Sequence, residues 1–500
     1  MRLDRWVAKL GNQARRTLRQ PSRLLFIPFG YLILSRWRNA GLWFLRGLSK
    51  YLPRRVGPNQ LYFVAGHQLL QLNRPEEAWQ CLEQCLRYSR DPGHYFMSAI
   101  CLYHGLGRFS DALDLLRQAN DLRIAQARKL GVADSPLRVL DEIWARHIGH
   151  TAALDYVIKL GILEGRGRDE TILYLPPTAH VANRFLLEQF KPHLKVVERP
   201  SDLPFGEDAV TALRFDYLGP RTPDGTTVYF WELAASTYQR WHAEGRAPLL
   251  TFPPDVDARG WQALRGAGVP AGAWFVTLHV RSGAWKRHHL GLHQVLNADI
   301  ASYLPAIAEI TRRGGWVIRM GDASMAPLPP MAHVIDYCHS DLRADWMDVF
   351  LAARCRFMLG TSSGPAYLPP LYGVPSVLTN WWPPGQPPWH PSDLFIPKLL
   401  RRIDDGRYLT MRETLAEPYS FCHSADYLRR TQRVEVVDND AEVIRAAVAE
   451  MLDRLDGIAT VDAAVERLRE QADRIYDACG CHGMGGLASG FVRARAALIQ

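Results

Sequence analysis

The chain has 500 residues, of which 47% are hydrophobic and 22% charged, a globular composition long enough for about three domains. Its net charge of +9 is uneven: residues 1–55 hold 13 Lys or Arg and one acid, so they carry +12 and leave −3 for the rest. A nucleic-acid-binding body is therefore disfavoured. Eight cysteines in so long a chain form no disulfide framework and indicate reduced thiols in a cytoplasmic protein.

The N-terminal segment predicts attachment to a membrane surface. Its apolar run at 24–34 has 11 residues, short of the ~20 that a spanning helix needs, and no signal-peptide cleavage site follows it. Basic residues beside Trp37 and Trp43 suit an interfacial segment lying on the anionic inner face of the plasma membrane. We expect residues 1–50 to make this peripheral contact; the alternative is that they pack on the next domain.

An internal repeat predicts a small helical domain at 56–135. The strings HQLLQLNRPEEAWQCLEQCL and CLYHGLGRFSDALDLLRQAN align under a shift of 34 residues, the period that tetratricopeptide repeats show. The matched positions are Leu72, Arg74, Ala78 and Leu82 with Leu106, Arg108, Ala112 and Leu116. Two repeats are too few for an independent solenoid, so we expect this domain to dock on its neighbours. It either presents a partner peptide or supports the next domain.

From about residue 140, short apolar runs alternate with helical stretches, which predicts parallel sheets covered on both faces. We expect two doubly wound Rossmann-like α/β domains, at 140–260 and 265–457, with a linker at 251–260 and C-terminal helices at 458–500. The expected strands lie at 171–177, 194–197, 274–280, 315–320, 333–337, 356–360 and 375–380, and helices are expected at 300–313 and 344–353.

Polar side chains follow the strands of the second half, where ligands of open α/β sheets bind. Arg281 ends one strand beside His279, Lys286 lies in the basic loop behind it, and a guanidinium fork matches phosphate oxygens. Solvated loops and capping carboxylates are the structural alternatives for such residues. The further candidates are Arg319, Asp322 and Asp336 after the next two strands, and Asn380 and Trp381 before a Pro-rich loop whose rings stack on a ligand or cover the sheet.

The string GTSSG at 360–364 has two interpretations. As G-x-S-x-G it resembles a nucleophile elbow, which would make Ser362 the nucleophile of a serine hydrolase. That reaction also needs a Gly-rich oxyanion loop upstream and an acid and a histidine on later strand ends, and the sequence offers neither. In the other interpretation Thr361, Ser362 and Ser363 supply hydroxyls to a ligand, and Gly364 opens a helix whose N-terminus receives an anion.

These motifs together resemble bacterial GT-B-type glycosyltransferases that are distantly similar to the fucosyltransferase superfamily. The resemblance covers roughly residues 145–455. The matching strings are IGH at 148–150, LHVR at 278–281, LNADIASYLPAIAEITRRGGWVIRMGD at 296–322, VIDY at 334–337, DVFLAARCRFMLGTSSGP at 348–365, YGVPSVLTN at 372–380 and VEVVDNDAEVIRAAVAEML at 434–452.

The resemblance implies a nucleotide-sugar donor held by the second α/β domain and an acceptor bound between the two domains. Arg281 would hold the donor diphosphate, although Ser282 stands where the family has an acidic residue. No DxD motif ends a strand, so we expect neither a metal nor a cofactor. His150 is the candidate base. The acceptor would be a cell-surface polysaccharide, a glycolipid or a protein, and the competing hypothesis is a scaffold whose α/β part is not catalytic.

Overall fold

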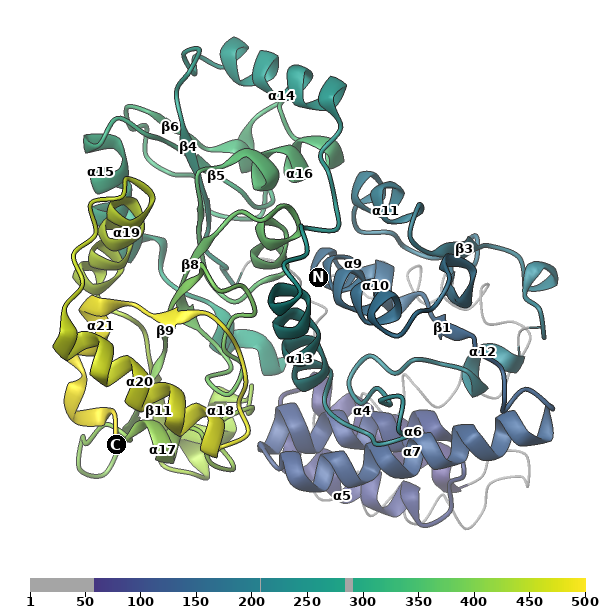
Figure 1. Ribbon diagram of the computed structural model, residues 1–500. Coiled ribbons are helices and arrows are strands. Elements are labelled where there is room, and N and C mark those ends of the chain that lie inside the picture. The colour runs from purple at the N-terminus through teal and green to yellow at the C-terminus, as the bar shows by residue number, and fades with distance from the viewer. Residues whose placement is uncertain (1–57, 207, 284–290) are drawn as a thin grey trace, which may run out of the picture.

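The computed structural model describes residues 58–206, 208–283 and 291–500, so the membrane segment predicted at 1–55 lies outside it. The described chain begins with a helical layer, which Figure 1 shows below the first α/β half and beside the second. This layer consists of α4 (Pro58–Gln71), α5 (Pro75–Leu86), α6 (Pro92–Ile100), the π-helical turn η1 (Cys101–Gly105) and α7 (Phe109–Lys129).

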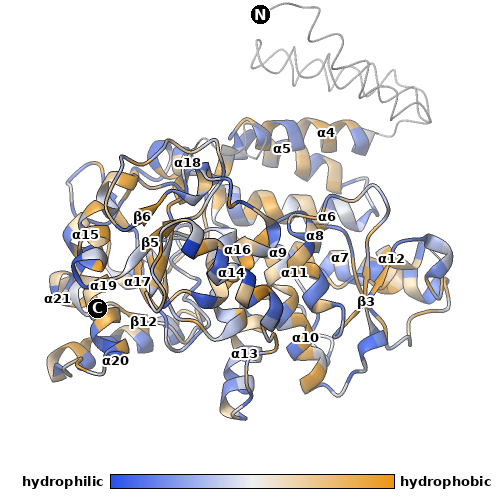
Figure 2. Ribbon diagram, turned by 90° about the horizontal axis from the view of Figure 1, so that it is seen from above, coloured by the Kyte–Doolittle hydropathy of each residue, from blue (hydrophilic) through white to orange (hydrophobic). Residues whose placement is uncertain are grey.

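The repeat period predicted from the sequence is present in this layer. Helices α4 and α6 begin at Pro58 and Pro92, and α5 and α7 begin at Pro75 and Phe109, so both pairs of helices keep the spacing of the sequence repeat. Ala78 and Ala112 occupy equivalent positions in α5 and α7, and both are fully buried because a small side chain lets two helices approach closely. Figure 2 shows hydrophobic and hydrophilic residues alternating along α4 and α5, as expected for helices with one face in a core.

The first α/β half is built on a parallel three-stranded sheet with the order β1-β2-β3. Strands β2 (Thr171–Tyr174) and β3 (Lys195–Val197) match two predicted strands, whereas β1 (Arg138–Leu140) was not predicted. The helices of this half are α8 (Ile143–Arg146), α9 (Ile148–Ala152), α10 (Leu154–Leu163), α11 (Arg184–Phe190), α12 (Asp208–Ala212) and α13 (Phe230–Ala243). In Figure 1, α13 lies between the two halves.

The second half contains a parallel seven-stranded sheet with the order β12-β9-β8-β7-β4-β5-β6. Without the short β12, this is the strand order of a doubly wound sheet: three successive strands extend to one side of β4 and two to the other. The strands are β4 (Phe275–His279), β5 (Trp316–Arg319), β6 (Val334–Ile335), β7 (Met358–Gly360), β8 (Ser376–Trp381), β9 (Leu394–Pro397) and β12 (Gly486–Leu487). A separate antiparallel pair is formed by β10 (Leu399–Arg402) and β11 (Val434–Val437).

Helices cover both faces of this sheet. The helices of this half are α14 (Pro254–Gly266), α15 (Leu304–Arg312), α16 (Asp345–Arg354), α17 (Met411–Thr414), α18 (Ala425–Arg430), α19 (Ala441–Leu455), α20 (Ala463–Ala478) and α21 (Ser489–Ala494); of these, α17 packs on α20 and α18 on β11. The segment 251–260, predicted as a linker, follows the last helix of the first half and precedes β4; α14 begins inside it and packs on α16. A Cβ on Gly260 would lie 2.3 Å from the Phe350 ring, so only glycine permits this contact.

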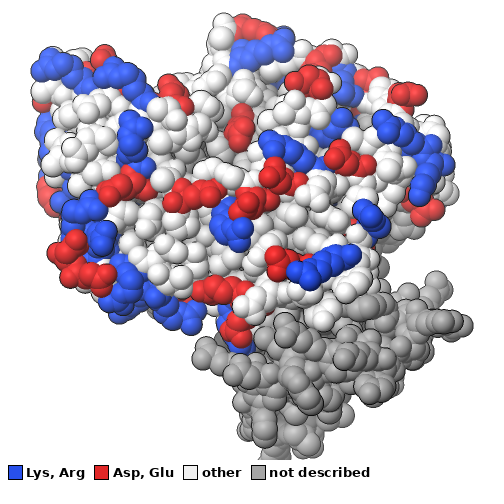
Figure 3. Space-filling model, turned by 90° about the horizontal axis from the view of Figure 1, so that it is seen from below, with Lys and Arg blue, Asp and Glu red and all other residues white. Residues whose placement is uncertain are grey.

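Among the helices of the described residues, none combines the length and apolar character needed to cross a bilayer. Figure 3 shows basic and acidic side chains interspersed on the face seen from below, without a wide area of one sign. All eight cysteines have free thiols.

Candidate functional site

The carboxyl ends of β4 and β7 form the centre of the candidate site. The two strands are paired, with His279 opposite Gly360. The chain leaves β4 toward β5 on one side of the sheet and leaves β7 toward β8 on the other. The loops after them therefore diverge, and such a switch point is where doubly wound sheets bind ligands.

Hydrogen bonds tie the two loops together. The Thr361 backbone N–H donates to His279 O (3.1 Å), and the Arg281 backbone N–H donates to Thr361 Oγ1 (3.1 Å). Ser363 Oγ donates to Thr361 O (3.1 Å) and lies 2.9 Å from His279 Nδ1. A hydroxyl has a single hydrogen, and Ser363 donates it to Thr361 O. Ser363 Oγ therefore accepts from His279, whose Nδ1 carries the proton. The sequence-predicted residues His279, Arg281, Thr361 and Ser363 are thus brought together.

Arg281 supplies a positive charge at this switch point. None of the carboxylates that the structure describes pairs with its guanidinium. Partial burial lowers the pKa of Arg281, yet a guanidinium stays protonated in proteins. An unpaired, partly buried guanidinium is suited to an anionic ligand, because the ligand would restore the interactions lost with water.

His279 is neutral at physiological pH. Burial, followed by the nearby charge of Arg281, lowers its pKa to about 4. With its proton on Nδ1, its Nε2 carries a lone pair and accepts hydrogen bonds. The strand end therefore combines one cation with one neutral acceptor.

The loop after β1 in the first half contacts the loop after β7. Helix α9 packs on the 3-10 turn η7 (Gly364–Tyr367), where a Cβ on Gly149 would lie 2.9 Å from Gly364 Cα. His150 is held at this junction, with Nδ1 2.8 Å from Ile143 O and its ring 4.2 Å from that of Tyr217. The IGH and GTSSG strings thus meet across the two halves.

The helix predicted to begin at Gly364 is only the four-residue turn η7, so the prediction of a helix N-terminus for an anion was wrong. Ser362 is also engaged: its buried Oγ accepts from the Trp382 backbone N–H (2.6 Å). Ser362 is buried, and none of the histidines that the structure describes hydrogen-bonds to it. The geometry therefore does not favour the serine hydrolase.

Three of the other predicted ligand residues bond within the protein. Arg319 is 2% exposed, donates to Ala326 O (2.7 Å) and pairs with Asp336 at 3.3 Å, so its charge is neutralised. Asn380 is fully buried, where its amide donates to Tyr303 Oη (3.0 Å) and its Oδ1 accepts from the Asn439 backbone N–H (2.7 Å). These contacts stabilise the sheet and do not favour donor binding.

The last three predicted residues have different surroundings. Trp381 is buried, and its indole donates to Gln386 O (2.6 Å). Asp322 accepts from the Ser324 backbone N–H (2.8 Å) in the turn after β5. Its charge opposes part of the lowering of the His279 pKa, so it lies near the switch point. Lys286 lies outside the described residues.

One cluster has donor atoms suited to a metal ion. Asp336, Cys338 and His339 place a carboxylate oxygen, Sγ and Nδ1 close together, with Cys338 Sγ 3.0 Å from Asp336 and 3.2 Å from His339. Burial raises the pKa of Cys338 to about 12, and Asp336 already pairs with Arg319. These features favour a protonated thiol in a hydrogen-bonded turn.

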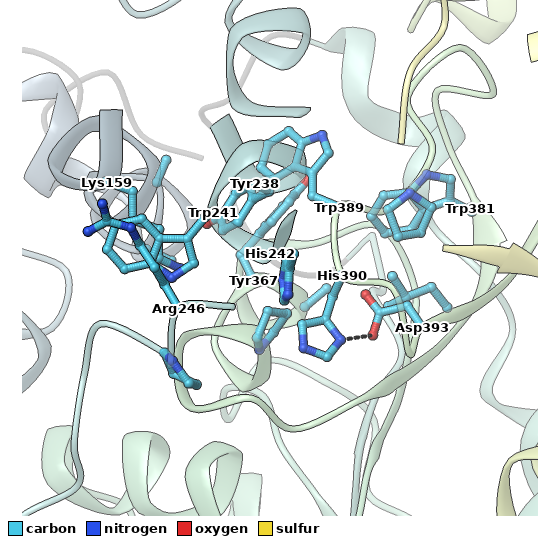
Figure 4. Close-up of a pocket in the computed structure, with 17 residues that line it drawn as sticks. Lys159, Tyr238, Trp241, His242, Arg246, Tyr367, Trp381, Trp389, His390 and Asp393 are labelled. Carbon is cyan, nitrogen blue, oxygen red and sulfur yellow. Dashed lines mark ion pairs between the residues drawn. The ribbon is translucent and has the colours of Figure 1, made fainter. Parts of the chain in front are cut away.

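A cavity lined by aromatic side chains lies where the two halves meet. Figure 4 shows Tyr238 and Trp241 from α13 on one side, with Tyr367 and Trp389 from the second half facing them. Its volume is about 50 Å³, which holds one or two water molecules. The cavity is therefore a closed seam between the halves.

The sequence did not predict a cluster of three histidines beside this site, one of them buried and two partly buried. His423 Nδ1 lies 3.1 Å from His293 Nδ1, and its ring lies 4.2 Å from that of His104 in η1. Burial is the first cause that lowers the pKa of His423, and the charge of Arg281 contributes. The three residues are far apart in the chain and carry no shared motif, so only the fold could bring them together.

No family model matches the chain, and no curated protein matches it. Among solved structures, the glycosyl transferase family 9 protein from Veillonella parvula DSM 2008 shares 9% identity over 49% of this chain and 80% of its own, with a TM-score of 0.32. The iron-containing dodecameric glycosyltransferase TibC from enterotoxigenic E. coli H10407 shares 14% identity over 64% and 76%, with a TM-score of 0.35. TibC in complex with ADP-D-beta-D-heptose shares 13% over 65% and 78%, also at 0.35. Scores this low carry no argument about this chain.

Proposed function

We propose that the protein is a GT-B-type glycosyltransferase that transfers a sugar from a nucleotide-sugar donor to a cell-surface polysaccharide, glycolipid or protein acceptor. The observation that carries this proposal is the guanidinium of Arg281, which pairs with no carboxylate among the described residues, at the switch point of a doubly wound sheet and beside the junction with the first half. In this account Arg281 binds the donor diphosphate and stabilises the charge that develops when the sugar leaves.

The remaining roles follow from the same geometry. Ser363 and the backbone around Gly364 would contact the donor. They belong to the loop after β7, which hydrogen bonds to His279 and Arg281 hold in place. The sugar-accepting substrate would bind at the junction of the halves, where His150 is the candidate base. Its Nδ1 donates to Ile143 O, so its Nε2 carries the lone pair that could take a proton. Arg281 would neutralise the charge of the leaving diphosphate without a metal, so we propose a metal-independent reaction.

Donor binding is tested by thermal shift and isothermal calorimetry with GDP, UDP, CMP and their sugar conjugates. We expect one nucleotide to stabilise the wild type and Arg281→Ala to weaken its binding by about 10- to 100-fold, the cost of a lost charge-assisted hydrogen bond. Arg281→Lys should recover part of the affinity, because it restores the charge without the fork. The matched control is Arg265→Ala, an exposed arginine on α14 without an ion pair in the described structure. A scaffold without catalysis would bind none of these nucleotides.

We also propose that residues 1–50 attach the protein to the inner face of the plasma membrane, which would bring it to lipid-linked acceptors. The support is their charge and their aromatic content. Flotation with vesicles containing anionic lipid tests this. The full chain should float and a chain without residues 1–50 should not, whereas equal flotation of both would contradict the assignment.

A further inference from the structure

A second cavity, which shares no lining residue with the aromatic one, is lined by five arginines. It has a volume of about 280 Å³ and lies between α7, the loop 133–137 and the segment 212–223. In Figure 1 the surrounding elements α7, β1 and α12 lie at the right. We call it the arginine cavity, after Arg123, Arg138, Arg166, Arg214 and Arg221.

The carboxylates near the arginine cavity are fewer than its arginines. Asp216 pairs with Arg123 (2.7 Å), Asp141 with Arg214 (3.1 Å), and Glu164 with both Arg138 (2.9 Å) and Arg166 (2.6 Å). None of these three carboxylates lines the cavity, so they lie behind the guanidinium groups. Asp134 lies in the loop 133–137 but does not line the cavity either. The cavity therefore presents a net positive charge.

Two of its guanidinium groups have buried N–H donors without acceptors. Arg123 is 4% exposed, and within the described part of the chain neither its Nε nor the buried Nε of Arg214 has a hydrogen-bond partner. Burial lowers the pKa of Arg123, and the positive charge of Arg214 lowers it further. The negative charge of Asp216 opposes this lowering but does not cancel it. Like charges held together with unpaired donors are costly unless an anion accepts their hydrogen bonds.

Arg221 is the most accessible of the five. Its side chain is exposed, it forms no ion pair among the residues that the structure describes, and its Nε donates only to Gly225 O at 3.3 Å. Asp224, in the same turn, is bonded to the Thr222 and Thr226 hydroxyls. Arg221 is thus free to turn toward a ligand at the mouth of the cavity.

We propose that the arginine cavity is a second anion-binding site, which takes a small molecule carrying a phosphate monoester or diphosphate. Guanidinium forks match phosphate oxygens in pairs, and several forks converge here on a space of small-molecule size. Arg138 opens β1, so the cavity lies toward the amino end of that strand, whereas the loop with His150 follows its carboxyl end. The site is therefore separate from Arg281 and does not depend on the proposed glycosyl transfer.

The test is calorimetric titration of the full chain with inorganic pyrophosphate. Arg281→Ala removes the proposed donor site, and we expect this variant to retain one pyrophosphate site. Adding Arg221→Glu to it should weaken that remaining binding by at least about tenfold, because a cation at the mouth becomes an anion. The control is Arg281→Ala with Arg265→Glu, which reverses an exposed charge on α14 and should bind as Arg281→Ala does.

Two results would overturn the proposal. One is that Arg281→Ala binds no pyrophosphate, and the other is that Arg221→Glu leaves its residual binding unchanged. Because Arg221 is exposed, its variants should fold, and an unchanged melting temperature without ligand verifies this. If the wild type binds pyrophosphate only at a site insensitive to Arg281, the donor assignment fails while the arginine cavity stands.

Discussion

Arg281 and Arg319 lie at or just beyond the ends of adjacent strands, and their surroundings give them different roles. Arg319 is almost fully buried, and its charge is balanced by Asp336. Arg281 has no such partner in the described structure, and only its backbone is bonded to the neighbouring loop. Both arginines could be predicted at strand ends from the sequence. Which of them is available to a ligand depends on a carboxylate that follows a different strand.

A second buried charge, Lys159, depends on a single carboxylate. Its Nζ lies 2.7 Å from Asp155, which also accepts from the Tyr238 hydroxyl (2.7 Å), and both charged side chains are almost fully buried. We expect Asp155→Asn to lower the free energy of unfolding by about 3–5 kcal/mol, because it leaves a buried cation unpaired. Urea denaturation measures this. Glu244→Gln, which removes an exposed partner of Arg240, should not shift the midpoint, and equal effects of the two changes would contradict the account.

Buried histidines predict how stability depends on pH. Burial lowers the pKa of His104 to about 4, from 6.5 in the unfolded chain. As the pH falls, His104 is protonated in the unfolded chain before it is protonated in the fold. Its contribution to the unfolding free energy is therefore present above pH 6.5 and is lost as the pH falls toward 4. Between pH 7 and pH 5 we expect the unfolding free energy of His104→Phe to fall by about 2 kcal/mol less than that of the wild type. Denaturation at the two pH values measures this, and an identical loss would show that folding does not lower the pKa of His104.

At the scale of elements, the sequence predicts some strands of each half and misses others. All five strands expected in the second half are present, and so are the helices expected at 300–313 and 344–353; α15 is shorter than expected, and α16 is shifted by one residue. Strands β1, β9, β10 and β11 were missed, and strand length is not the reason, because the equally short β3 and β7 were predicted. Strand β12 was missed because its two residues belong to the C-terminal segment, which returns to pair with β9. The contact between α9 and η7 likewise joins segments that are distant in the sequence and share no motif.

That contact predicts a steric effect. A Cβ on Gly149 would approach Gly364 Cα to 2.9 Å, so Gly149→Ala must push α9 away from η7. We expect the variant to lose about 1–3 kcal/mol of unfolding free energy. Thermal denaturation compares it with Gly266→Ala in α14, where a Cβ meets nothing within 4 Å. We expect this control variant to gain about 0.5–1 kcal/mol of unfolding free energy. Equal stability of Gly149→Ala and the wild type would contradict the close approach.

At the scale of the whole molecule, the helical layer is joined to the second half. Phe421 packs on Tyr103 of the layer and on Trp231 of α13, with ring centroids 5.2 Å and 4.9 Å apart. Asn73 donates to Asp426 (2.7 Å), and the Ser110 backbone N–H donates to Glu417 (2.7 Å). The expectation that two repeats dock on their neighbours agrees with these contacts. Their partners could not be predicted, since they belong to the C-terminal part of the chain and follow no pattern shared with the repeats.

This docking predicts that the layer does not fold alone. A fragment of residues 58–135 would expose Tyr103 and the other side chains that face Phe421, and its core would lose the neighbours that stabilise it. We expect the fragment to show no cooperative thermal transition by circular dichroism. In the full chain, the layer should melt together with the second half. A sharp transition of the isolated fragment would show that the layer is an independent domain.

We propose above all that the ends of β4 and β7 hold the diphosphate of a nucleotide-sugar donor. The most direct test is an experimental structure of the full chain with the nucleoside diphosphate that gives the largest thermal shift. We expect diphosphate oxygens within hydrogen-bonding distance of the Arg281 guanidinium, beside Ser363. A nucleotide bound elsewhere, with the Arg281 guanidinium free of it, would contradict the account.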